Sequence, residues 1–362
     1  MSDKVKNVVV TISFLLVIII MLIANLIEQD KEVSLAERRR LQQFPKFSIN
    51  QLFKGTFFEK FEKYTMDQFV QREAFRSLKT RMEIGVLKKQ DSNNIYEHDG
   101  KLIEQIYPLN EKSVVNLTKK MNEINQRYVK ENNKVYYTIV PDKNYFANTN
   151  HLKLDYQKLQ DMMAEDLKWA EYIDIFDCLD LSCYYATDSH WKQETLQKVV
   201  NKIDTKMDLK IQNNYEEKSV IDFKGVYAGQ FPIEIGKDEI RILTNEVIEN
   251  CTVYNYETGK KTKIYNMNKI NAPDKYDIYL SGATPLLTIE NPKVKQNKEL
   301  IVFRDSYGSS LVPLLVKEYS KITLIDTRYI SPKILGEYVE FQNNDVLFIY
   351  STLLINNSTS LK

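Results

Sequence analysis

The chain has 362 residues, of which 43% are hydrophobic and 27% charged, and its formal net charge is +1. This length predicts two domains or one elaborated α/β domain with a sizeable core, because domains typically hold about 150 residues. The composition excludes the disordered, collagen-like and disulfide-dense classes. The balanced charge argues against a nucleic-acid partner, because no long-range positive field is present.

The N-terminus contains an uncharged apolar run at residues 8–27, VVVTISFLLVIIIMLIANLI. As a helix it is about 30 Å long, which is enough to span a membrane. Lys4 and Lys6 precede it, so the positive-inside rule predicts a cytoplasmic tail at 1–7 and an extracytoplasmic body. A cleavable signal peptide is the alternative. The length of the run and the absence of an evident small-x-small cleavage site favour a single-pass, uncleaved anchor.

Residues 28–95 are rich in aromatic and charged residues at roughly helical spacing, which predicts a helical stalk. Residues 96–362 alternate helical patterns with short β-rich runs, which predicts crossover units and a parallel sheet. The helical patterns cover 117–132, 152–169, 191–207 and 309–319, and the β-rich runs cover 135–140, 172–176, 299–305, 321–326 and 346–350. Short β segments between about 222 and 280 predict an antiparallel insertion, with a hairpin that turns at Thr258 and Gly259.

The three cysteines, Cys178, Cys183 and Cys251, are few for an exported protein. Cys178 and Cys183 are close enough in sequence to pair, but we favour small buried thiols, because so short a bridge removes little loop entropy. We predict no metal site, since no histidines accompany the C-x4-C spacing.

The segment YYATDSHWKQETL, residues 184–196, places Asp188 two residues before His190. At this separation in an extended or turning segment, both side chains can reach the same side. Such an aspartate can orient the imidazole while the other ring nitrogen acts as a base. The alternative is a helix N-cap formed by Asp188 or Ser189, with His190 merely packed.

A second segment, IVFRDSYGSSLVPLL at 301–315, reads as a buried strand that ends in Asp305 and Ser306, followed by an apolar helix. A serine at such a turn lies at the carboxyl edge of the sheet, where α/β proteins build their sites. Backbone N–H groups at the helix start can stabilise an oxyanion. The alternative is an ordinary serine N-cap.

These motifs resemble those of the SGNH (GDSL-type) hydrolases. D-S-Y-G is similar to their nucleophile block, with Arg304 in place of the usual glycine, and D-x-H-W is similar to their Asp/His block but precedes the serine. This permuted order resembles the DHHW family and the alginate O-acetylation proteins of the AlgJ and AlgX type. Weaker supporting motifs are ERRRLQQFP, FEKYTMDQFVQR, VPDK, DFKGVYAG, LIDTRYISP and DVLFIYSTLLINNS. The resemblance implies a three-layer, circularly permuted SGNH-like α/β domain with a β insertion.

The resemblance further implies that Ser306 is the nucleophile, His190 the general base and Asp188 its orienting acid. Asn356, next to Asn357, is the best match for the oxyanion asparagine. The family's glycine block is not recognisable in LIDTRYISP. The further candidate contacts to oxyanion or substrate are Arg328, Tyr329 and Lys143, although a solvated surface lysine is the commoner explanation of the last.

The resulting prediction is an extracytoplasmic O-acetyltransferase that modifies an exported or cell-wall polysaccharide and needs no cofactor. The sequence contains no acyl-CoA or nucleotide motif, so the resemblance implies a membrane-bound O-acyltransferase partner that supplies the acyl group. Two alternatives stay open. One is a glycan esterase with the same three residues, and the other is a non-catalytic scaffold or glycan-binding subunit of an export complex.

Overall fold

The computed structural model describes every residue except 1, 35, 38, 212, 213 and 343. The chain divides into two compact units. The N-terminal unit comprises residues 1–92 and 229–234, and the C-terminal unit comprises residues 93–228 and 235–362. The division falls three residues before the boundary between the stalk and the SGNH-like domain that we expect from the sequence.

The N-terminal unit begins with helix α1 (Asp3–Ile27), which contains the whole predicted apolar span. None of its side chains is buried, and it is long and apolar enough to cross a membrane. The residues that follow are only partly helical, because an extended segment precedes the helices of the predicted stalk. The elements after α1 are β1 (Val33–Ser34), β2 (Arg39–Arg40), α2 (Ile49–Phe53), α3 (Thr56–Asp67), α4 (Arg72–Arg81) and the π-helix η1 (Met82–Val86).

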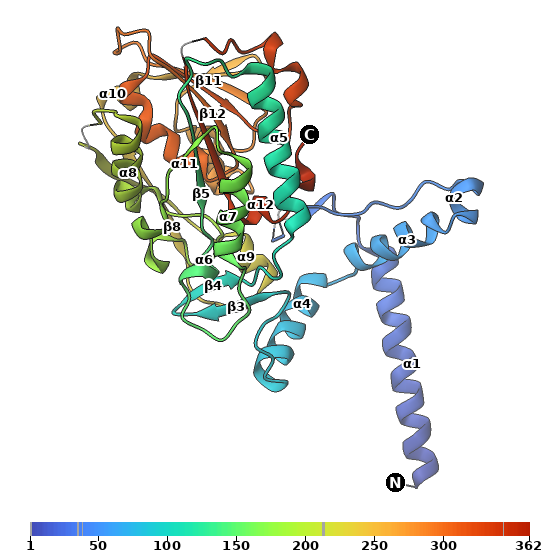
Figure 1. The fold of residues 1–362 in the computed structure, drawn as a ribbon. Coiled ribbons are helices and arrows are strands. Elements are labelled where there is room, and N and C mark those ends of the chain that lie inside the picture. The colour runs from blue at the N-terminus through green and yellow to red at the C-terminus, as the bar shows by residue number, and fades with distance from the viewer. Residues whose placement is uncertain (1, 35, 38, 212–213, 343) are drawn as a thin grey trace. The chain divides into compact units, whose positions relative to one another are not determined.

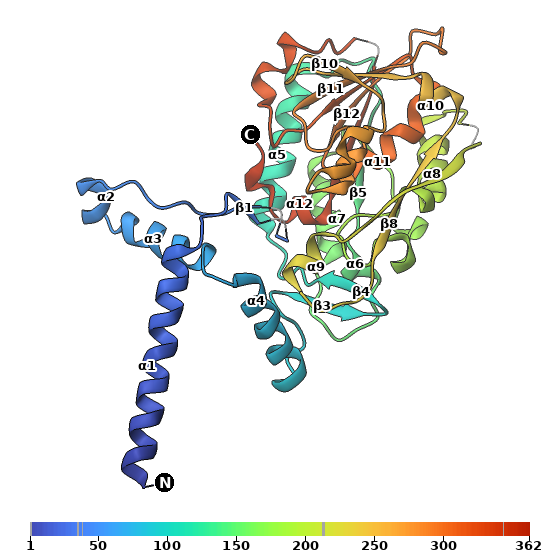
Figure 2. The same ribbon diagram turned by 180° about the vertical axis from the view of Figure 1, so that it is seen from behind.

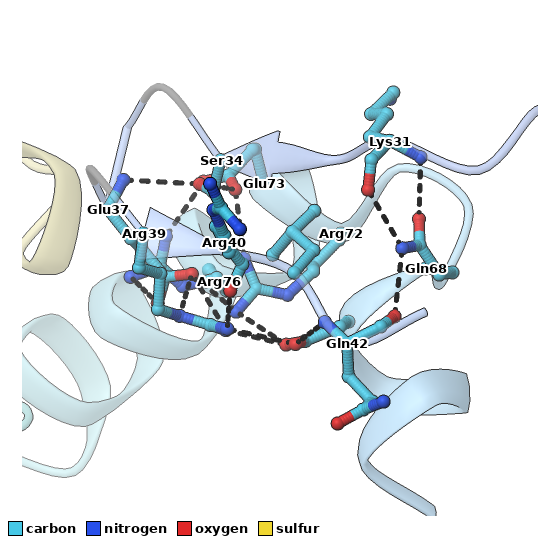
Figure 3. A network of polar contacts seen from close by, with 12 residues as sticks. Lys31, Ser34, Glu37, Arg39, Arg40, Gln42, Gln68, Arg72, Glu73 and Arg76 are labelled. Atoms are coloured by element: carbon cyan, nitrogen blue, oxygen red, sulfur yellow. Dashed lines mark hydrogen bonds and ion pairs between the residues drawn. The ribbon is translucent and has the colours of Figure 1, made fainter. Parts of the chain in front are cut away.

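A network of charged side chains holds the N-terminal unit together (Figure 3). Glu37 accepts from Arg39, and its carboxylate lies 2.8 Å from Arg72 and 3.2 Å from Arg76. Arg39 also forms two hydrogen bonds to Asp67, and these lower the pKa of that carboxyl. The two motifs ERRRLQQFP and FEKYTMDQFVQR, which are 24 residues apart at their starts, therefore contact each other.

The C-terminal unit is built on an eight-stranded sheet with the order β10-β9-β11-β13-β12-β14-β5-β6 (Figure 1). The strands from β13 to β6 pair in parallel, as predicted, whereas β10, β9 and β11 pair antiparallel to their neighbours. The sheet is therefore mostly parallel. The strands are β5 (Val135–Val140), β6 (Glu171–Tyr172), β9 (Thr252–Asn255), β10 (Lys260–Thr262), β11 (Leu286–Glu290), β12 (Glu299–Arg304), β13 (Lys321–Ile325) and β14 (Asn344–Ser351).

Both faces of the sheet are buried, which makes the unit three-layered (Figures 1 and 2). Successive residues of a strand point to opposite faces. Accordingly Leu300 and Val302 of β12 belong to one apolar cluster, and Ile301 and Phe303 belong to the other. The first cluster includes side chains of α8 (Gln197–Met207), α11 (Gly308–Leu311) and η7 (Val312–Glu318), and the second includes side chains of α5 (Glu111–Tyr128) and α7 (Tyr156–Asp166).

The remaining elements of the chain after residue 92 are short. Two of them, β7 (Glu216–Phe223) and β8 (Asp238–Thr244), form a separate antiparallel sheet. The others are β3 (Ile95–His98), β4 (Lys101–Glu104), α6 (Lys143–Phe146), α9 (Val226–Gln230), α10 (Glu246–Asn250), α12 (Thr352–Ile355) and the 3-10 turns η2 (Phe176–Cys178), η3 (Leu181–Cys183), η4 (Gln193–Thr195), η5 (Met267–Asn271), η6 (Lys275–Ile278), η8 (Pro332–Glu337) and η9 (Ser358–Ser360).

Four element predictions need correction. The helix predicted at 191–207 begins only at Gln197, because residues 193–195 form the 3-10 turn η4. The predicted strand at 172–176 is reduced to β6, because a 3-10 turn begins at Phe176. The predicted helix at 309–319 is helical only to Leu311 and then becomes 3-10, at a point where Pro313 lacks a backbone donor. The predicted β insertion is not one module, since β9 and β10 extend the central sheet while β7 and β8 stand apart. Its hairpin is confirmed, with Gly259 at φ +64°.

Candidate active site

The predicted nucleophile lies where β12 ends, at the carboxyl edge of the parallel strands. Both carboxylate oxygens of Asp305 hold the turn in place. Oδ1 accepts from the backbone N–H of Tyr307 at 3.0 Å. Oδ2 accepts from the N–H and the hydroxyl of Ser351, on the neighbouring strand β14, at 2.8 and 2.6 Å. Tyr307, not Ser306, is the N-cap of α11. The hydroxyl of Ser306 is therefore free of a capping role.

The segment that carries Asp188 and His190 is a tight loop closed by an antiparallel bridge between Tyr184 and Trp191. Asp238, at the start of β8, holds the loop by accepting from the N–H and hydroxyl of Thr187 at 2.7 and 2.5 Å. The helix that follows is capped at Leu196, and the turn before it at Lys192. Asp188 is therefore not a helix cap.

The loop and the turn bring Asp188, His190 and Ser306 into one chain of hydrogen bonds. Nδ1 of His190 lies 2.6 Å from Oδ1 of Asp188, and Nε2 lies 2.7 Å from Oγ of Ser306. Asp188 is fully buried and His190 is 8% exposed. With Nδ1–H donated to the carboxylate, Nε2 accepts from the serine hydroxyl, which is the arrangement that activates a serine as a nucleophile.

The backbone of a glycine turn packs against Asp188 from the other side. The N–H of Val226 donates to Oδ2 of Asp188 at 3.0 Å, and the N–H of Gly225 donates to Thr187 Oγ1 at 2.7 Å. A Cβ on Gly225 would lie 2.3 Å from Cβ of Asp188, so only glycine permits this approach. The turn belongs to the motif DFKGVYAG, whose role the sequence alone does not reveal.

An aromatic side chain that no sequence pattern singles out packs on the imidazole. The ring of Tyr276 stacks on His190 with a centroid separation of 3.9 Å and an interplanar angle of 12°. Its hydroxyl hydrogen-bonds to Ser310 Oγ at 2.7 Å, and Ser310 Oγ also accepts from the indole N–H of Trp191 at 2.9 Å. The stack fixes the plane of the imidazole and excludes water from one of its faces.

Ser306 and His190 line a pocket of about 480 Å³. Two of the predicted substrate contacts, Arg328 and Tyr329, also line it. The lining residues are Ser189, His190, Asp305, Ser306, Tyr307, Arg328, Tyr329, Ser351, Leu353, Leu354, Asn357 and Ser360.

Arg328 places a positive charge in the lining of this pocket, and Asp326 holds its side chain in position. The buried carboxylate of Asp326 accepts from Nε and Nη2 of Arg328 at 2.9 and 2.6 Å. Burial acts to lower the pKa of Arg328, but the hydrogen bonds to Asp326 outweigh it and the pKa is raised. Among the described residues, none accepts a hydrogen bond from Nη1, so this edge of the guanidinium is available to a ligand.

The predicted oxyanion asparagine is not in the pocket. Oδ1 of Asn356 accepts from the N–H of Asn110 at 2.7 Å, and its Nδ2 donates to the carbonyl of Pro108 at 3.2 Å. These bonds hold the side chain of Asn356 against the loop at residues 108–110 and away from the pocket lining. Asn357, the next residue, lines the pocket instead, and its Oδ1 accepts from Thr359.

Lys143 is neither a solvated surface residue nor part of the pocket lining. It is 3% exposed, its Nζ donates to the carbonyl of Tyr185 at 3.1 Å, and it lies 4.9 Å from the centre of the Tyr227 ring. Burial lowers the pKa of Lys143 to about 7, although the charge of Asp188 acts in the opposite direction. Lys143 therefore packs outside the pocket lining, where it contacts Tyr185 and Tyr227 and its charge interacts with Asp188.

Arg304, which stands where SGNH enzymes usually have glycine, turns into the protein interior. Its Nη2 donates to the carbonyl of Gly282 at 3.0 Å, and its Nη1 donates to Ser309 Oγ at 3.0 Å and lies 3.9 Å from Asp326. Burial lowers the pKa of this guanidinium. The side chain of Arg304 thus points away from the turn that carries Ser306.

The cysteines take no part in the site. Cys178, Cys183 and Cys251 are all free and buried, in agreement with the expectation of small buried thiols. Burial raises the pKa of Cys178 to about 11 and that of Cys251 to about 12. Among the described residues, no three histidine, cysteine or acidic side chains gather as metal ligands would.

Comparison with solved structures supports the fold that the motifs imply. A DHHW family protein from Eubacterium siraeum is similar with a TM-score of 0.61 and 17% identity, over 75% of this chain and 95% of that protein. Bacillus cereus PatB1 with a sulfonyl adduct is similar with a TM-score of 0.55 and 17% identity, over 72% of this chain and 97% of PatB1. No protein-family model and no curated protein sequence matches the chain. The resemblance to the DHHW family is confirmed at the level of the fold.

Proposed function

We propose that the chain is a membrane-anchored, extracytoplasmic O-acetyltransferase that acts on an exported or cell-wall polysaccharide. The observation that carries this proposal is the chain of hydrogen bonds of 2.6 and 2.7 Å that joins Asp188, His190 and Ser306 at the edge of an open pocket. The DHHW-like fold supports it. The apolar helix α1 supports the placement at a membrane.

The first half of the reaction forms an acyl-serine. Ser306 Oγ attacks the acyl carbonyl of the donor while His190 Nε2 takes the hydroxyl proton, and Asp188 stabilises the imidazolium that results. Asn357 faces the pocket and is our revised candidate for an oxyanion donor. The tetrahedral intermediate then expels the donor's leaving group, which receives the proton from His190.

The second half transfers the acyl group to the acceptor. His190 removes the proton of a sugar hydroxyl, whose oxygen attacks the carbonyl of the acyl-serine. The bond between the acyl carbon and Ser306 Oγ then breaks, and Oγ takes the proton from His190, which regenerates the free serine. Arg328 and Tyr329 form the side of the pocket that would contact the sugar. We assign the supply of acyl groups to a membrane-bound O-acyltransferase partner, because the proposed site lies outside the cytoplasm, where soluble acyl-CoA is absent.

Intact-mass spectrometry of the full chain in detergent after incubation with p-nitrophenyl acetate tests the proposal. We expect a gain of one acetyl group in the native protein and none in Ser306→Ala or His190→Ala. Since a PatB1 structure carries a sulfonyl adduct, a sulfonyl fluoride is a second probe, and labelling should map to Ser306. A Ser306→Ala variant that still gained the acetyl group would refute the assignment of the nucleophile.

The same preparation separates transfer from hydrolysis. An acetyltransferase should lose its acetyl group faster when a cell-wall oligosaccharide is added, and the oligosaccharide should gain the mass of acetyl. Equal release of acetate with and without oligosaccharide would identify an esterase. Absence of any adduct, with retained binding of oligosaccharide, would support a non-catalytic role.

A further inference from the structure

The N-terminal unit leaves a group of phenylalanine rings exposed, which we call the aromatic surface. Its rings pack on one another: Phe57 stacks on Phe61 at 6.3 Å, and Phe44 meets Phe61 edge-on at 5.9 Å. Even so, Phe53 is 86% exposed and Phe58 is 59% exposed. The aromatic surface comprises Phe44, Phe47, Phe53, Phe57, Phe58 and Phe61.

Helix α3, which carries half of these rings, is amphipathic. Phe57, Phe58 and Phe61 are spaced one and four residues apart and share one side of the helix. Glu59 and Lys63 lie on the opposite side, and the charged residues Lys60 and Glu62 flank the rings. Between residues 44 and 66 four lysines stand against two glutamates. Exposed phenylalanines on one face and charged residues on the other, in a segment with an excess of lysine, are typical of helices that lie in a membrane interface.

The position of α3 relative to α1 agrees with this composition. The hydroxyl of Tyr64 donates to Asp30 at 3.0 Å, and the N–H of Val70 donates to Asn25 of α1 at 2.9 Å. These bonds fix α3 at the C-terminal end of α1, and α3 runs across that end with α2 beyond it (Figures 1 and 2). If α1 stands upright in the membrane, α3 lies along the membrane surface.

We propose that the aromatic surface is immersed in the outer interface of the same lipid bilayer that α1 crosses. The inference rests on α1 as a membrane span and does not depend on the acyl-transfer chemistry. Aromatic side chains favour the headgroup region, and lysines around them attract anionic headgroups. Continuity with α1 favours lipid over a soluble partner, because bonds within the unit hold the aromatic surface at the level where α1 emerges.

Tryptophan fluorescence of the full chain in vesicles tests the inference. The chain is reconstituted into phosphatidylcholine and phosphatidylglycerol vesicles, with or without brominated acyl chains that quench indoles in contact with lipid. The variant is Phe58→Trp. Lys63→Trp, on the opposite side of the same helix, and Leu152→Trp, at an exposed position of the C-terminal unit, are the controls. The native Trp169 and Trp191 give a background that is subtracted.

We expect the emission of Phe58→Trp to shift to shorter wavelength in vesicles and to be quenched by at least half with brominated lipid. We expect little quenching at Lys63→Trp and none at Leu152→Trp. Emission of Phe58→Trp typical of a water-exposed indole, without quenching, would overturn the inference and point to a protein partner or a second copy. Equal quenching at Phe58→Trp and Lys63→Trp would also overturn it. Failure of the native chain to float with vesicles would refute α1 as the anchor, whereas floating without quenching refutes the aromatic surface alone.

Discussion

The substitution Gly225→Ala should disable the site without touching any residue that meets the substrate. A Cβ at this position would lie 2.3 Å from Asp188 Cβ and 2.4 Å from the carbonyl oxygen of Thr187. Neither neighbour is the free end of a flexible side chain, so the glycine turn must move. A displacement of about 1 Å is needed to reach ordinary van der Waals contact.

Such a displacement breaks the hydrogen bond from Val226 N–H to Asp188, because its present length of 3.0 Å would grow to about 4 Å. A hydrogen bond to a buried charge contributes about 1.5 to 3 kcal/mol to stability. A shift of about 1 Å in a catalytic group can cost about 100-fold in rate. We therefore expect Gly225→Ala to lower kcat/KM by about 100-fold and the free energy of unfolding by about 2 kcal/mol.

The assay is hydrolysis of p-nitrophenyl acetate by the full chain in detergent, with thermal unfolding followed by circular dichroism. Gly85→Ala is the matched control, because its Cβ meets nothing within 4 Å and its backbone needs no positive φ. A double-mutant cycle with Asp188→Asn separates positioning from general destabilisation: if Gly225 acts through Asp188, its replacement should cost little more in the Asp188→Asn background. A Gly225→Ala enzyme with native kcat/KM would refute the reasoning. So would a double variant whose loss of kcat/KM equals the sum, in free energy, of the losses in Gly225→Ala and Asp188→Asn.

Three further predictions concern buried or fixed cations. Burial lowers the pKa of Lys143 to about 7, so unfolding takes up a proton between this value and the ordinary lysine pKa of about 10.4. The free energy of unfolding should then rise with pH over that range, by at most about 1.4 kcal/mol per pH unit. Denaturant titrations at several pH values should show that Lys143→Met lacks this contribution. If the free energy of unfolding of Lys143→Met changed with pH as steeply as that of the native protein, the prediction would be contradicted. Arg328→Ala should raise KM for an acidic oligosaccharide about 10-fold, as the loss of one charge-assisted hydrogen bond implies. The rate of p-nitrophenyl acetate hydrolysis should stay within about 2-fold of the native rate. An equal loss of kcat/KM with both substrates would place Arg328 at the reacting atoms. Arg304→Met should lower the free energy of unfolding by about 2 kcal/mol, because the Gly282 carbonyl and the Ser309 hydroxyl lose their donor; a more stable variant in thermal unfolding would show that the buried cation costs more than it contributes.

The strands that surround the site could be predicted because each is a short apolar run bounded by polar residues. The run at 299–305 ends in Asp305, with Ser306 next, and β12 ends at Arg304, just before them. The antiparallel strand β11 was not predicted, because a run of only five residues between the turns at 280–281 and 292–293 can also be read as a loop. Nothing in such a run shows the direction in which it pairs. The strands of the parallel half of the sheet were therefore all predicted, whereas the prediction of the antiparallel half lacked β11.

Side-chain direction was the limit of sequence reasoning at the site. Asn356 and Asn357 are adjacent beyond α12, and about 100° of rotation separates successive residues of a helical turn. One binds the loop at Pro108 and the other faces the pocket. Tyr276 could not be foreseen at all, because a tyrosine in a 3-10 turn carries no pattern that indicates a stack on His190.

Two of the weak motifs, DFKGVYAG and VPDK, act on the carboxylate of Asp188. Asp188 accepts hydrogen bonds from the ring and backbone of His190 in its own motif and from Val226 in DFKGVYAG. The charge of Asp188 also acts on Lys143 of VPDK. Three segments far apart in sequence thus constrain one buried anion, and a change in any of them should alter the orientation of His190 toward Ser306. Each motif alone is short and common, but the fold requires them together, because a buried carboxylate is stable only when all of its partners are in place.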